Sequence, residues 1–476
     1  MKNNSSFTSL TIVLLIALSA GCAGNKPAHA DRQKIPIETT QSNKMALQEE
    51  FVGIWKGRLS AGVQDLDMSL KVTPLDAYLD VPAQNLKDFK ASSLSYERGL
   101  LVVEFASFGA SMEARLGESD TLDATWKQGG RSFPLSLERV DVASLNGANE
   151  SEGLKSGYEG LAVTFKSDQI GVELAGTLRL PEGQGPFPCL ILISGSGPQD
   201  RDESIYGIRP FRDIAEALAA KGWASLRYDD RGVGESGGVF AGATSADFVR
   251  DALGAYRFAL ADPHIDPKRV GLCGHSEGGY IAPAAENALG GVYALVLLAA
   301  PGVSGYEILL DQSADILAAM GASPSDIAAA AAVNKSIYDM VLTPGALPSD
   351  AIRTTLSKAG VPENQLDAQI AALSDPWFMA FLKTDPATVV GKVKSPILAL
   401  NGSKDLQVRA DKNLLALKDA ASKAEVPFQA ELLEGLNHLF QAADTGLPEE
   451  YSRLTPRFSP EALDTIITWL LALPKP

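Results

Sequence analysis

The pentapeptide GHSEG at Gly274–Gly278 constrains the fold of this chain more than any other stretch. It follows the apolar run Arg269–Cys273 and precedes the helix-compatible run Gly279–Glu286, an order that predicts a strand, a sharp turn and a helix. A serine hydroxyl is a poor nucleophile at neutral pH, so a hydrolase exposes it on a tight turn, next to a base and oriented donors. The same pattern occurs in ordinary Gly/Ser turns, but the flanking strand and helix favour Ser276 as a nucleophile.

A base for Ser276 can be found by elimination among four histidines. These are His29, His264, His275 and His438. The first lies in a polar N-terminal stretch, the second in a turn rich in Asp and Pro, and the third inside the pentapeptide itself. His438 remains, in a loop that follows the strand-like run Phe428–Leu433. We therefore predict His438 as the general base.

The acid that orients His438 is expected between Ser276 and His438 in chain order, just after a strand. The run Ser395–Leu400 predicts that strand, and Asp405 lies in the loop beyond it. The preceding strand-like run, Tyr293–Leu298, ends in a loop without a carboxylate. A lone aspartate here could cap a helix, and a lone histidine could be an ordinary loop residue. Their joint order after two strands predicts the triad Ser276, Asp405 and His438.

Two backbone donors are expected beside Ser276, because donors aimed at the tetrahedral oxyanion contribute strongly to catalysis. One is the N–H of Glu277, the residue after the nucleophile. The other should come from a loop after an earlier strand, and Pro188–Ile193 is such a strand. The glycine-rich loop beyond it favours the N–H of Ser196, with Gly197 as its neighbour. A simple strand-to-loop turn is the alternative for this segment.

Four further segments, together with the pentapeptide, carry a family resemblance: Ile193–Asp202, Tyr228–Ser236, Asp375–Phe378 and Asn401–Val408. On these residues, the region from about 157 to 473 resembles the α/β-hydrolase superfamily, and within it the bacterial EstD-type carboxylesterases, often grouped with serine aminopeptidase-like domains. The resemblance implies ester hydrolysis by the predicted triad, without metal or cofactor. Many relatives have His-Gly where this chain has Ser194-Gly195, which changes the side-chain support of the oxyanion loop but not its backbone donors.

The first residues predict an export signal. Lys2 and the apolar run Leu10–Ala20 are typical of a signal peptide, and the run is short for a membrane span. Cys22 follows a sequence similar to a bacterial lipobox, although Ser19 stands where leucine is usual, and cleavage after Ala30 is the alternative. We expect a lipoprotein attached to the membrane through Cys22 and facing the periplasm, or otherwise a secreted or periplasmic protein.

Charge and cysteine content limit the partners and the covalent structure. The formal net charge of −16 argues against nucleic acid, whose phosphates require a basic surface. Apart from Cys22, the cysteines are Cys189 and Cys273. In the expected sheet they lie on neighbouring strands with an offset of on the order of 12 Å, which is too long for a disulfide. We expect both to be buried thiols.

Short apolar runs between turn residues predict a small β domain, as an antiparallel meander or small barrel. The runs are Phe51–Leu59, Leu66–Val72, Leu100–Phe105 and Leu122–Trp126. Trp55 and Trp126 could bind a sugar or another substrate, but aromatic residues in such strands are more often part of the core. The predicted division of the chain is signal peptide and lipobox 1–22, tether 23–48, antiparallel β domain 49–140, linker 141–156 and hydrolase domain 157–476.

Strands and amphipathic helices alternate in the hydrolase domain, which indicates a mostly parallel sheet covered on both faces. From about 303 to 388, alanine-rich helical runs replace this alternation and predict a helical cap after the sixth strand. The expected fold is therefore an α/β-hydrolase fold with a helical cap, preceded by a small antiparallel β domain. Trp377, Phe378 and Phe381 are candidates for substrate binding, although an amphipathic helix would bury some of them.

These features predict a serine carboxylesterase that hydrolyses small-molecule esters of short to medium acyl chain through an acyl-enzyme. A lysophospholipase is one alternative, since a lipid anchor would place the enzyme beside such a substrate. A serine peptidase of the prolyl-oligopeptidase type is another, although such enzymes usually carry a large propeller. A non-enzymatic binding protein on this fold would normally lack a triad member.

Overall fold

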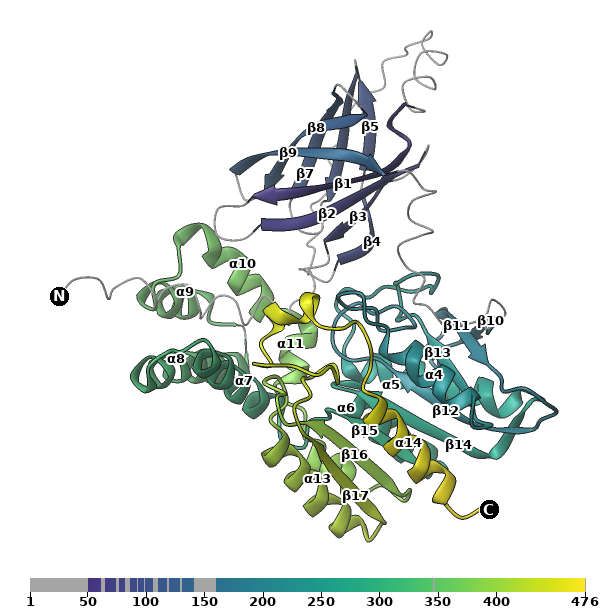
Figure 1. Ribbon diagram of the computed structural model, residues 1–476. Coiled ribbons are helices and arrows are strands. Elements are labelled where there is room, and N and C mark those ends of the chain that lie inside the picture. Colours follow the sequence, from purple (N-terminus) through teal and green to yellow (C-terminus); the bar gives the residue numbers. More distant parts are fainter. Residues whose placement is uncertain are drawn as a thin grey trace. The chain divides into compact units, whose positions relative to one another are not determined.

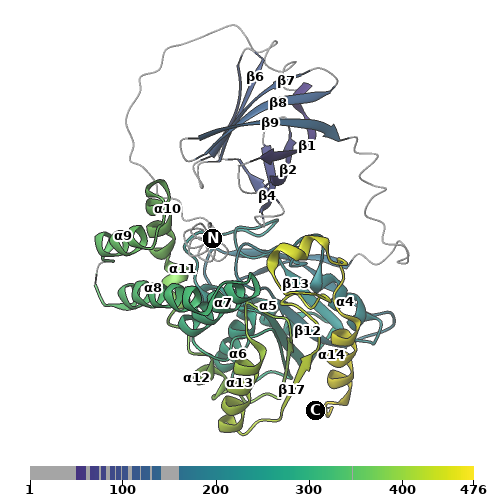
Figure 2. The same cartoon turned by 60° about the vertical axis from the view of Figure 1, so that its left-hand side comes forward.

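The computed structural model describes residues 50–475 except 61–64, 74–76, 82–85, 92, 98, 106–109, 118–119, 129–130, 141–159 and 346. These residues form two compact units, a β unit that ends at Val140 and an α/β unit that begins at Gly160 (Figures 1 and 2). The predicted signal peptide, tether and linker lie outside the described residues, as does Cys22. Within the described part of the chain, no helix has both the length and the apolar character needed to cross a membrane.

The β unit is one antiparallel sheet in the order β4-β3-β2-β1-β9-β8-β7-β6-β5. Its strands are β1 Gly53–Ser60, β2 Asp65–Val72, β3 Ala77–Val81, β4 Leu86–Lys90, β5 Ser93–Glu97, β6 Leu100–Phe105, β7 Ala110–Leu116, β8 Thr121–Gln128 and β9 Arg131–Val140. Alternate residues of β6 and β8 are buried, so each strand contributes one face to the core. Trp55 and Trp126 are 0% and 4% exposed, which confirms that they are core residues.

The four apolar runs in the sequence predict fewer strands than this sheet contains. Strand β7 shows why, because its buried residues are Ala110, Met112 and Ala114, which alternate with a serine, a glutamate and an arginine. Two of those three buried side chains are small, so the apolar alternation is weak in the sequence. The strand is fixed instead by its pairing with β6 and β8.

The α/β unit is built on a sheet in the order β10-β11-β13-β12-β14-β15-β16-β17. Its strands are β10 Leu161–Lys166, β11 Glu173–Arg179, β12 Phe187–Ile193, β13 Ala224–Tyr228, β14 Ile265–His275, β15 Leu295–Leu298, β16 Ile397–Gly402 and β17 Phe428–Leu433. Strand β11 is antiparallel to both of its neighbours, and all pairs from β13 to β17 are parallel. Cys189 on β12 and Cys273 on β14 are buried and free, as expected.

Helices cover both faces of this sheet (Figure 1) because parallel strands need crossover connections. They are α4 Pro210–Ala219, α5 Ser245–Ala261, α6 Gly278–Leu289, α13 Ala410–Ala424 and α14 Pro460–Ala472. The 3-10 helix η3 Pro448–Arg453 packs instead with Ile208 and Leu439 through Tyr451. Ile191 and Ile193 of β12 pack into the core with α5, α6 and α13, whereas Leu190 and Leu192 pack into the core with α4 and α14. Burial on both sides explains why β12 is a continuous apolar run.

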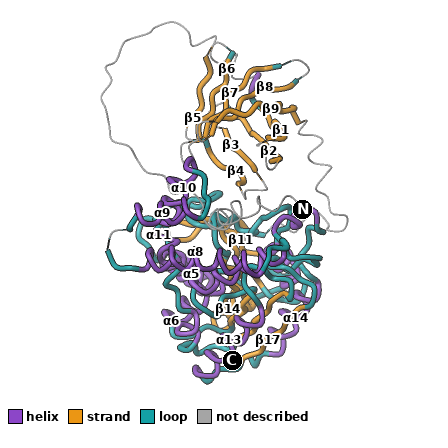
Figure 3. The backbone as a smooth tube through the Cα atoms, turned by 90° about the vertical axis from the view of Figure 1, so that its left-hand side faces the viewer, coloured by secondary structure: helices purple, strands orange, loops and turns teal. Residues whose placement is uncertain are grey.

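A helical cap is inserted between β15, the sixth strand of the α/β unit along the chain, and β16. Several of its helices lie together in Figure 3. Its helices are α7 Gly305–Ala319, α8 Pro324–Leu342, α9 Ser349–Lys358, α10 Glu363–Leu373 and α11 Pro376–Phe381, and α12 Pro386–Val390 leads back to the sheet. The hydroxyl of Ser323 accepts a hydrogen bond from the N–H of Asp326, and Pro324 occupies the first turn, a combination that is typical of a helix start. The expected fold, with cap and preceding β domain, is confirmed.

Candidate active site

Ser276 occupies the turn between the end of β14 and the start of α6. Its φ of +52° lies in the left-handed region that residues other than glycine rarely adopt. The N–H of Ser276 donates to the carbonyl oxygen of Leu298 at 2.8 Å. A Cβ on Gly274 would come within 1.9 Å of the Gly278 carbonyl oxygen, and a Cβ on Gly278 within 2.2 Å of the Ile193 carbonyl oxygen. This turn therefore requires glycine on both sides and leaves Ser276 partly exposed at the carboxyl edge of the sheet.

Asp405 and His438 meet at the same edge, from the loops after β16 and β17. Nδ1 of His438 lies 2.8 Å from Oδ2 of Asp405, and both side chains are about 95% buried, with exposures of 5% each. Oδ1 of Asp405 accepts hydrogen bonds from the N–H groups of Gln407 and Val408, each at 2.8 Å. An acceptor that is fixed in this way directs a proton onto Nδ1, so Nε2 of His438 is the nitrogen left to accept one.

The turn that carries Ser276, called the elbow below, is in direct contact with the loop that carries His438. The ring of His275, the residue before Ser276, lies 4.9 Å from the ring of His438 between centroids. Nε2 of His275 donates to the backbone carbonyl oxygen of His438 at 3.0 Å. The structure therefore brings Ser276, Asp405 and His438 together at one edge of the sheet, in the chain order that the sequence predicts.

The predicted oxyanion loop lies against the nucleophile. A Cβ on Gly195 would come within 3.0 Å of the Ser276 Cβ, so the backbone of this loop approaches the serine closely. Asp230 holds the loop at two points, since its carboxylate accepts from the Ser194 hydroxyl and from the N–H of Gln199, both at 3.0 Å. The pKa of Asp230 lies well above its usual range because the carboxyl group is buried, and the two hydrogen bonds only partly oppose this rise. Ser194, where many relatives have histidine, thus provides one of the two contacts by which Asp230 holds the loop.

Within this loop, the N–H of Gly195 already donates to Oε1 of Glu203 at 2.7 Å. It is therefore not available to a substrate, whereas the predicted donors are the next N–H groups along the loop, at Ser196 and Gly197. Gly197 has a φ of +95°, which a larger residue would disfavour. The loop conformation is compatible with the predicted oxyanion hole.

The side chain of Glu277, the other predicted donor residue, is 2% exposed and accepts hydrogen bonds from three elements. Its donors are the hydroxyl of Ser196 at 2.7 Å, the hydroxyl of Ser245 at 2.5 Å and the indole N–H of Trp377 at 2.9 and 3.0 Å. Burial raises the pKa of Glu277, and the three donors oppose that rise. This carboxylate therefore connects the predicted oxyanion loop, the start of α5 and the cap helix α11 at the residue that follows Ser276.

The three aromatic residues proposed for substrate binding lie on α11 with different exposure. Trp377 is partly exposed and stacks on Phe381, with ring centroids 5.1 Å apart and an interplanar angle of 19°. Phe381 is 8% exposed. Phe378 is 1% exposed and packs edge-to-face on Tyr338 inside the core of the cap. Trp377 is therefore the member of this group that presents surface next to Glu277.

Charged residues near the site that could have contacted substrate are engaged in ion pairs. Arg201 pairs with Asp229 and Glu235, and Arg231 pairs with Asp251. Asp202 pairs with Arg227, and Asp200 accepts from the backbone N–H groups of residues 202 and 204. Their ion-pair partners lie on other segments of the chain, which favours a structural role for these charges.

Two residues of this site were not predicted, Glu203 and His275. Oε1 of Glu203 lies 2.9 Å from Nδ1 of His275, and both side chains are buried. Their sequence separation is 72 residues, and Glu203 follows two other acidic residues, so no local pattern distinguishes it. A φ of +53° at Glu203 marks the position as unusual, but only the structure reveals it.

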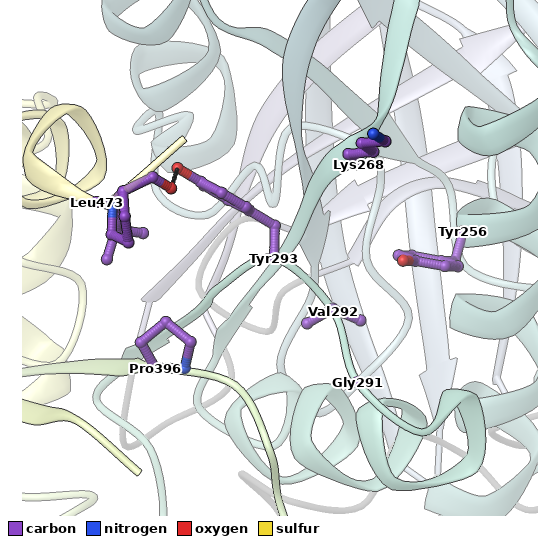
Figure 4. Close-up of a pocket in the computed structure, with 8 residues that line it drawn as sticks. Tyr256, Lys268, Gly291, Val292, Tyr293, Pro396 and Leu473 are labelled. Atoms are coloured by element: carbon purple, nitrogen blue, oxygen red, sulfur yellow. Dashed lines mark hydrogen bonds between the residues drawn. The ribbon is translucent and has the colours of Figure 1, made fainter. Parts of the chain in front are cut away.

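A cavity at the opposite edge of the sheet contains none of these groups. Its volume is about 420 Å³, and it is lined by Tyr256, Lys268, Gly291, Val292, Tyr293, Pro396, Leu473 and Pro474 (Figure 4). Tyr293 and Pro396 directly precede the parallel strands β15 and β16, so this is the amino edge. Ligands of open α/β sheets bind at the carboxyl edge, which favours the Ser276 region as the functional site. No cluster of His, Cys, Asp and Glu in the described ranges has the arrangement needed for a metal ion.

Sequence comparisons show similarity to a serine aminopeptidase family and to an esterase. Residues 208–441 match the family model described as serine aminopeptidase, S33. The esterase EstD of Thermotoga maritima is 27% identical over 312 residues, which are 65% of this chain and 68% of EstD. An uncharacterized peptidase of Bacillus subtilis, YuxL, is 36% identical over 158 residues, which are 32% of this chain and 23% of YuxL.

Two solved structures are similar to part of this chain. Est1E of Butyrivibrio proteoclasticus with bound ferulic acid is 17% identical, with a TM-score of 0.39 and coverage of 65% of this chain and 100% of Est1E. The Pyrococcus furiosus esterase Pf2001 is 16% identical, with a TM-score of 0.38 and coverage of 59% of this chain and 85% of Pf2001.

The sheet order, the strained serine turn and the sequence matches define the α/β unit as an α/β-hydrolase domain. Residues 208–441 are thus similar to the serine aminopeptidase family, and 65% of the chain resembles the esterase EstD.

Proposed function

We propose that this protein is a serine carboxylesterase in which Ser276, His438 and Asp405 act as nucleophile, general base and orienting acid. The observation that carries the proposal is the buried 2.8 Å contact between His438 and Asp405 at the sheet edge where Ser276 sits on a strained turn. A serine needs such a base to become nucleophilic near neutral pH. The match to EstD over 65% of the chain favours esters as the substrate class.

In the proposed reaction, Nε2 of His438 takes the hydroxyl proton of Ser276 as its oxygen attacks the ester carbonyl. Asp405 stabilises the resulting imidazolium through Nδ1. The same proton then goes to the leaving alcohol, which departs and leaves an acyl group on Ser276. Water, activated by His438, attacks the acyl-enzyme and releases the carboxylic acid. No metal or cofactor takes part in this sequence of steps.

The oxyanion of each tetrahedral intermediate is proposed to bind the N–H groups of Ser196 and Glu277, with Gly197 beside them. Support comes from the close approach of Gly195 to Ser276 and from the two anchors that Asp230 provides to the loop. A donor held rigidly at this position costs no reorganisation during the reaction and is therefore effective.

For the acyl group, we propose a short to medium chain that contacts the cap at Trp377 and Phe381, with Phe378 supporting them from the cap core. The indole N–H of Trp377 donates a hydrogen bond to the side chain of Glu277, the residue after Ser276, so the indole lies near the proposed reacting atoms. Two stacked aromatic rings offer an apolar surface to an acyl chain.

The test is labelling with a fluorophosphonate probe, followed by hydrolysis of a series of p-nitrophenyl esters from acetate to palmitate. We expect modification at Ser276, and no label or hydrolysis in Ser276→Ala. Label on a different residue, or full hydrolysis by Ser276→Ala, would contradict the proposal.

A serine peptidase is the second candidate, because the matched family model carries the name serine aminopeptidase. Such an enzyme would use the same triad, so labelling does not separate the two. An aminoacyl-arylamide and a lysophospholipid, added to the ester series, do so. Faster turnover of either compound than of the best ester would replace the carboxylesterase assignment with that activity.

We also propose that the protein is exported and attached to a membrane through a lipidated Cys22, facing the periplasm. The motif that supports this is the apolar run Leu10–Ala20 followed by a cysteine. Lipidated protein should partition into detergent, and Cys22→Ala should move it to the soluble fraction. A soluble wild type whose N-terminus follows Ala30 would show that cleavage occurs at the alternative site.

A further inference from the structure

The elbow, the oxyanion loop and the His438 loop come from three distant parts of the chain, and one buried pair touches all three. Oε1 of Glu203 accepts from the N–H of Gly195 at 2.7 Å and faces Nδ1 of His275 at 2.9 Å. On its other side, Nε2 of His275 donates to the carbonyl oxygen of His438 at 3.0 Å. The path from Gly195 to His438 therefore runs through two side chains.

The hydrogen-bond partners fix where the protons lie. A carbonyl oxygen can only accept, so Nε2 of His275 must carry a proton. Oε1 of Glu203 accepts from the N–H of Gly195 and faces Nδ1 of His275, so a proton between these two atoms makes the contact a hydrogen bond. Burial lowers the pKa of His275, but the charge of Glu203 and the hydrogen bonds to Glu203 and His438 outweigh it and raise the pKa above its ordinary value. These contacts favour the protonated form of His275, with the carboxyl group of Glu203 as its partner.

This pair is expensive to build, which argues that it does more than fill space. Glu203 is 1% exposed and His275 is 4% exposed, and burying both charges carries a desolvation cost. Glu203 also adopts a φ of +53°, a strained conformation for a residue other than glycine. Strain and buried charge that coincide beside a nucleophile are typical of functional sites.

We propose that Glu203 and His275 are positioning residues that clamp the oxyanion loop and the His438 loop to the nucleophile turn, a role that rests on the proposed function. Glu203 holds the backbone at Gly195 against Ser276, directly before the predicted donor at Ser196. His275 holds the backbone of His438, so the base cannot move away from the serine. Neither residue exchanges a proton with substrate.

The chain supplies a matched control in Glu286. This glutamate is also 1% exposed, and its Oε1 accepts two hydrogen bonds, from the N–H of Lys394 and the hydroxyl of Ser395, both at 2.8 Å. In both glutamates, Oε2 has no hydrogen-bond partner among the described residues. Glu286 lies near the end of α6 and contacts the segment that leads into β16, so it belongs to the amino edge.

The experiment compares Glu203→Gln, His275→Gln, their double variant and Glu286→Gln in the full-length protein, with p-nitrophenyl acetate as substrate. Small displacements of catalytic groups cost up to about 100-fold in rate, so we expect kcat to fall about 10- to 100-fold in the first two variants while KM changes less than about 2-fold. The double variant should fall no further than the worse single one, because both residues act in one clamp. Glu286→Gln should keep the wild-type kcat.

The pH profile of kcat/KM provides a readout that a purely structural role would not change. His275→Gln leaves the Glu203 carboxylate uncompensated near His438, so the acid limb should move to higher pH, whereas Glu203→Gln should not move it in that direction. The other titratable groups around the pair are Asp405 on His438, and Asp230 and Cys273, which face Glu203.

Melting temperatures identify variants that fail to fold. If Glu203→Gln does not fold, His275→Gln still tests the contact that holds the His438 loop, because this variant leaves the bond from Gly195 to Glu203 in place. Equal kcat in all variants and unmoved acid limbs would overturn the clamp while leaving the esterase assignment intact. Absence of ester hydrolysis by the wild type itself would instead contradict the proposed function.

Discussion

The carboxyl edge of the central sheet carries a group of buried ionisable side chains, whereas the amino edge carries a cavity of about 420 Å³. At the carboxyl edge, Glu203, His275, Glu277, Asp405 and His438 are each 5% exposed or less. At the amino edge, the cavity of about 420 Å³ is lined mostly by apolar residues and by exposed or half-exposed polar ones such as Lys268 and Tyr293.

We infer from this comparison that a cavity alone is a poor guide to the functional site of this protein. Burying a charge is costly unless partners hold it, so a concentration of held charges marks where the fold has accepted a cost for function. Among the described residues, the amino edge also contains a buried carboxylate, Glu286, which joins α6 to the segment before β16. Substitutions at the two edges should therefore differ sharply in their effect on activity.

The largest expected effect is at the triad. Ser276→Ala and His438→Ala should each lower kcat by on the order of 10⁴-fold or more, because serine and base act as one unit. For the same reason, the double variant should be no slower than the slower single variant. Steady-state hydrolysis of p-nitrophenyl acetate measures all three. A double variant whose loss equals the product of the two single losses would show that the residues act independently.

A smaller effect is expected in the choice of acyl chain at Trp377. Trp377→Ala removes both the apolar surface and the hydrogen bond to Glu277, and lost apolar contacts of this kind cost about 1 to 3 kcal/mol in discrimination. Turnover of long-chain relative to acetate esters should change about 10- to 100-fold, while acetate turnover stays near the wild-type value. The ratio of kcat/KM across the ester series is the measurement.

Trp377→Phe is the matched control, since phenylalanine keeps an aromatic ring over Phe381 but cannot donate to Glu277. It should retain most of the chain-length profile if apolar contact sets the preference. Wild-type selectivity in Trp377→Ala would exclude this residue from the pocket and would favour the β unit as the source of selectivity.

The buried ion pair at the carboxyl edge should also appear in the pH dependence of stability. The pKa of His275 is raised above its ordinary value of 6.5, so the pair stabilises the fold fully below that pH, and the contribution is lost as pH rises through the folded pKa. The melting temperature of the wild type should therefore fall by a few degrees between about pH 6 and 9. His275→Gln should show a smaller fall, and an identical fall in both proteins would mean that His275 is neutral in the fold.

The difference between the edges also explains what the sequence predicts. Asp405 and His438 could be found because parallel strands end at one edge, and each residue follows a recognisable apolar run. Glu203 could not, because its contact with His275 spans 72 residues and its neighbours Asp200 and Asp202 look equivalent in the sequence. His275 could be assigned only to the turn itself.

The cap shows the same limit. Ser323-Pro324 predicts the start of α8, because capping depends on residues that are adjacent in the chain. The burial of Phe378 beneath Tyr338, and the bond from Trp377 to Glu277, depend on how helices pack, and an aromatic run such as Trp377–Phe381 does not specify which ring faces outward.

The smallest expected effect, at the amino edge, is the one that can break the comparison. The hydroxyl of Tyr293 donates to the carbonyl oxygen of Pro474 at 3.2 Å in an exposed setting, so Tyr293→Phe should cost no more than about 0.5–1.5 kcal/mol of stability. Its kcat should stay within about 2-fold of the wild type, because the residue precedes β15 while Ser276 lies at the opposite edge, and Lys268→Ala should behave alike. Thermal melting and ester hydrolysis measured on the same samples separate the two effects. A loss of activity without a loss of stability in either variant would mean that the cavity at the amino edge takes part in turnover. Buried charge alone would then not identify the functional edge of the sheet.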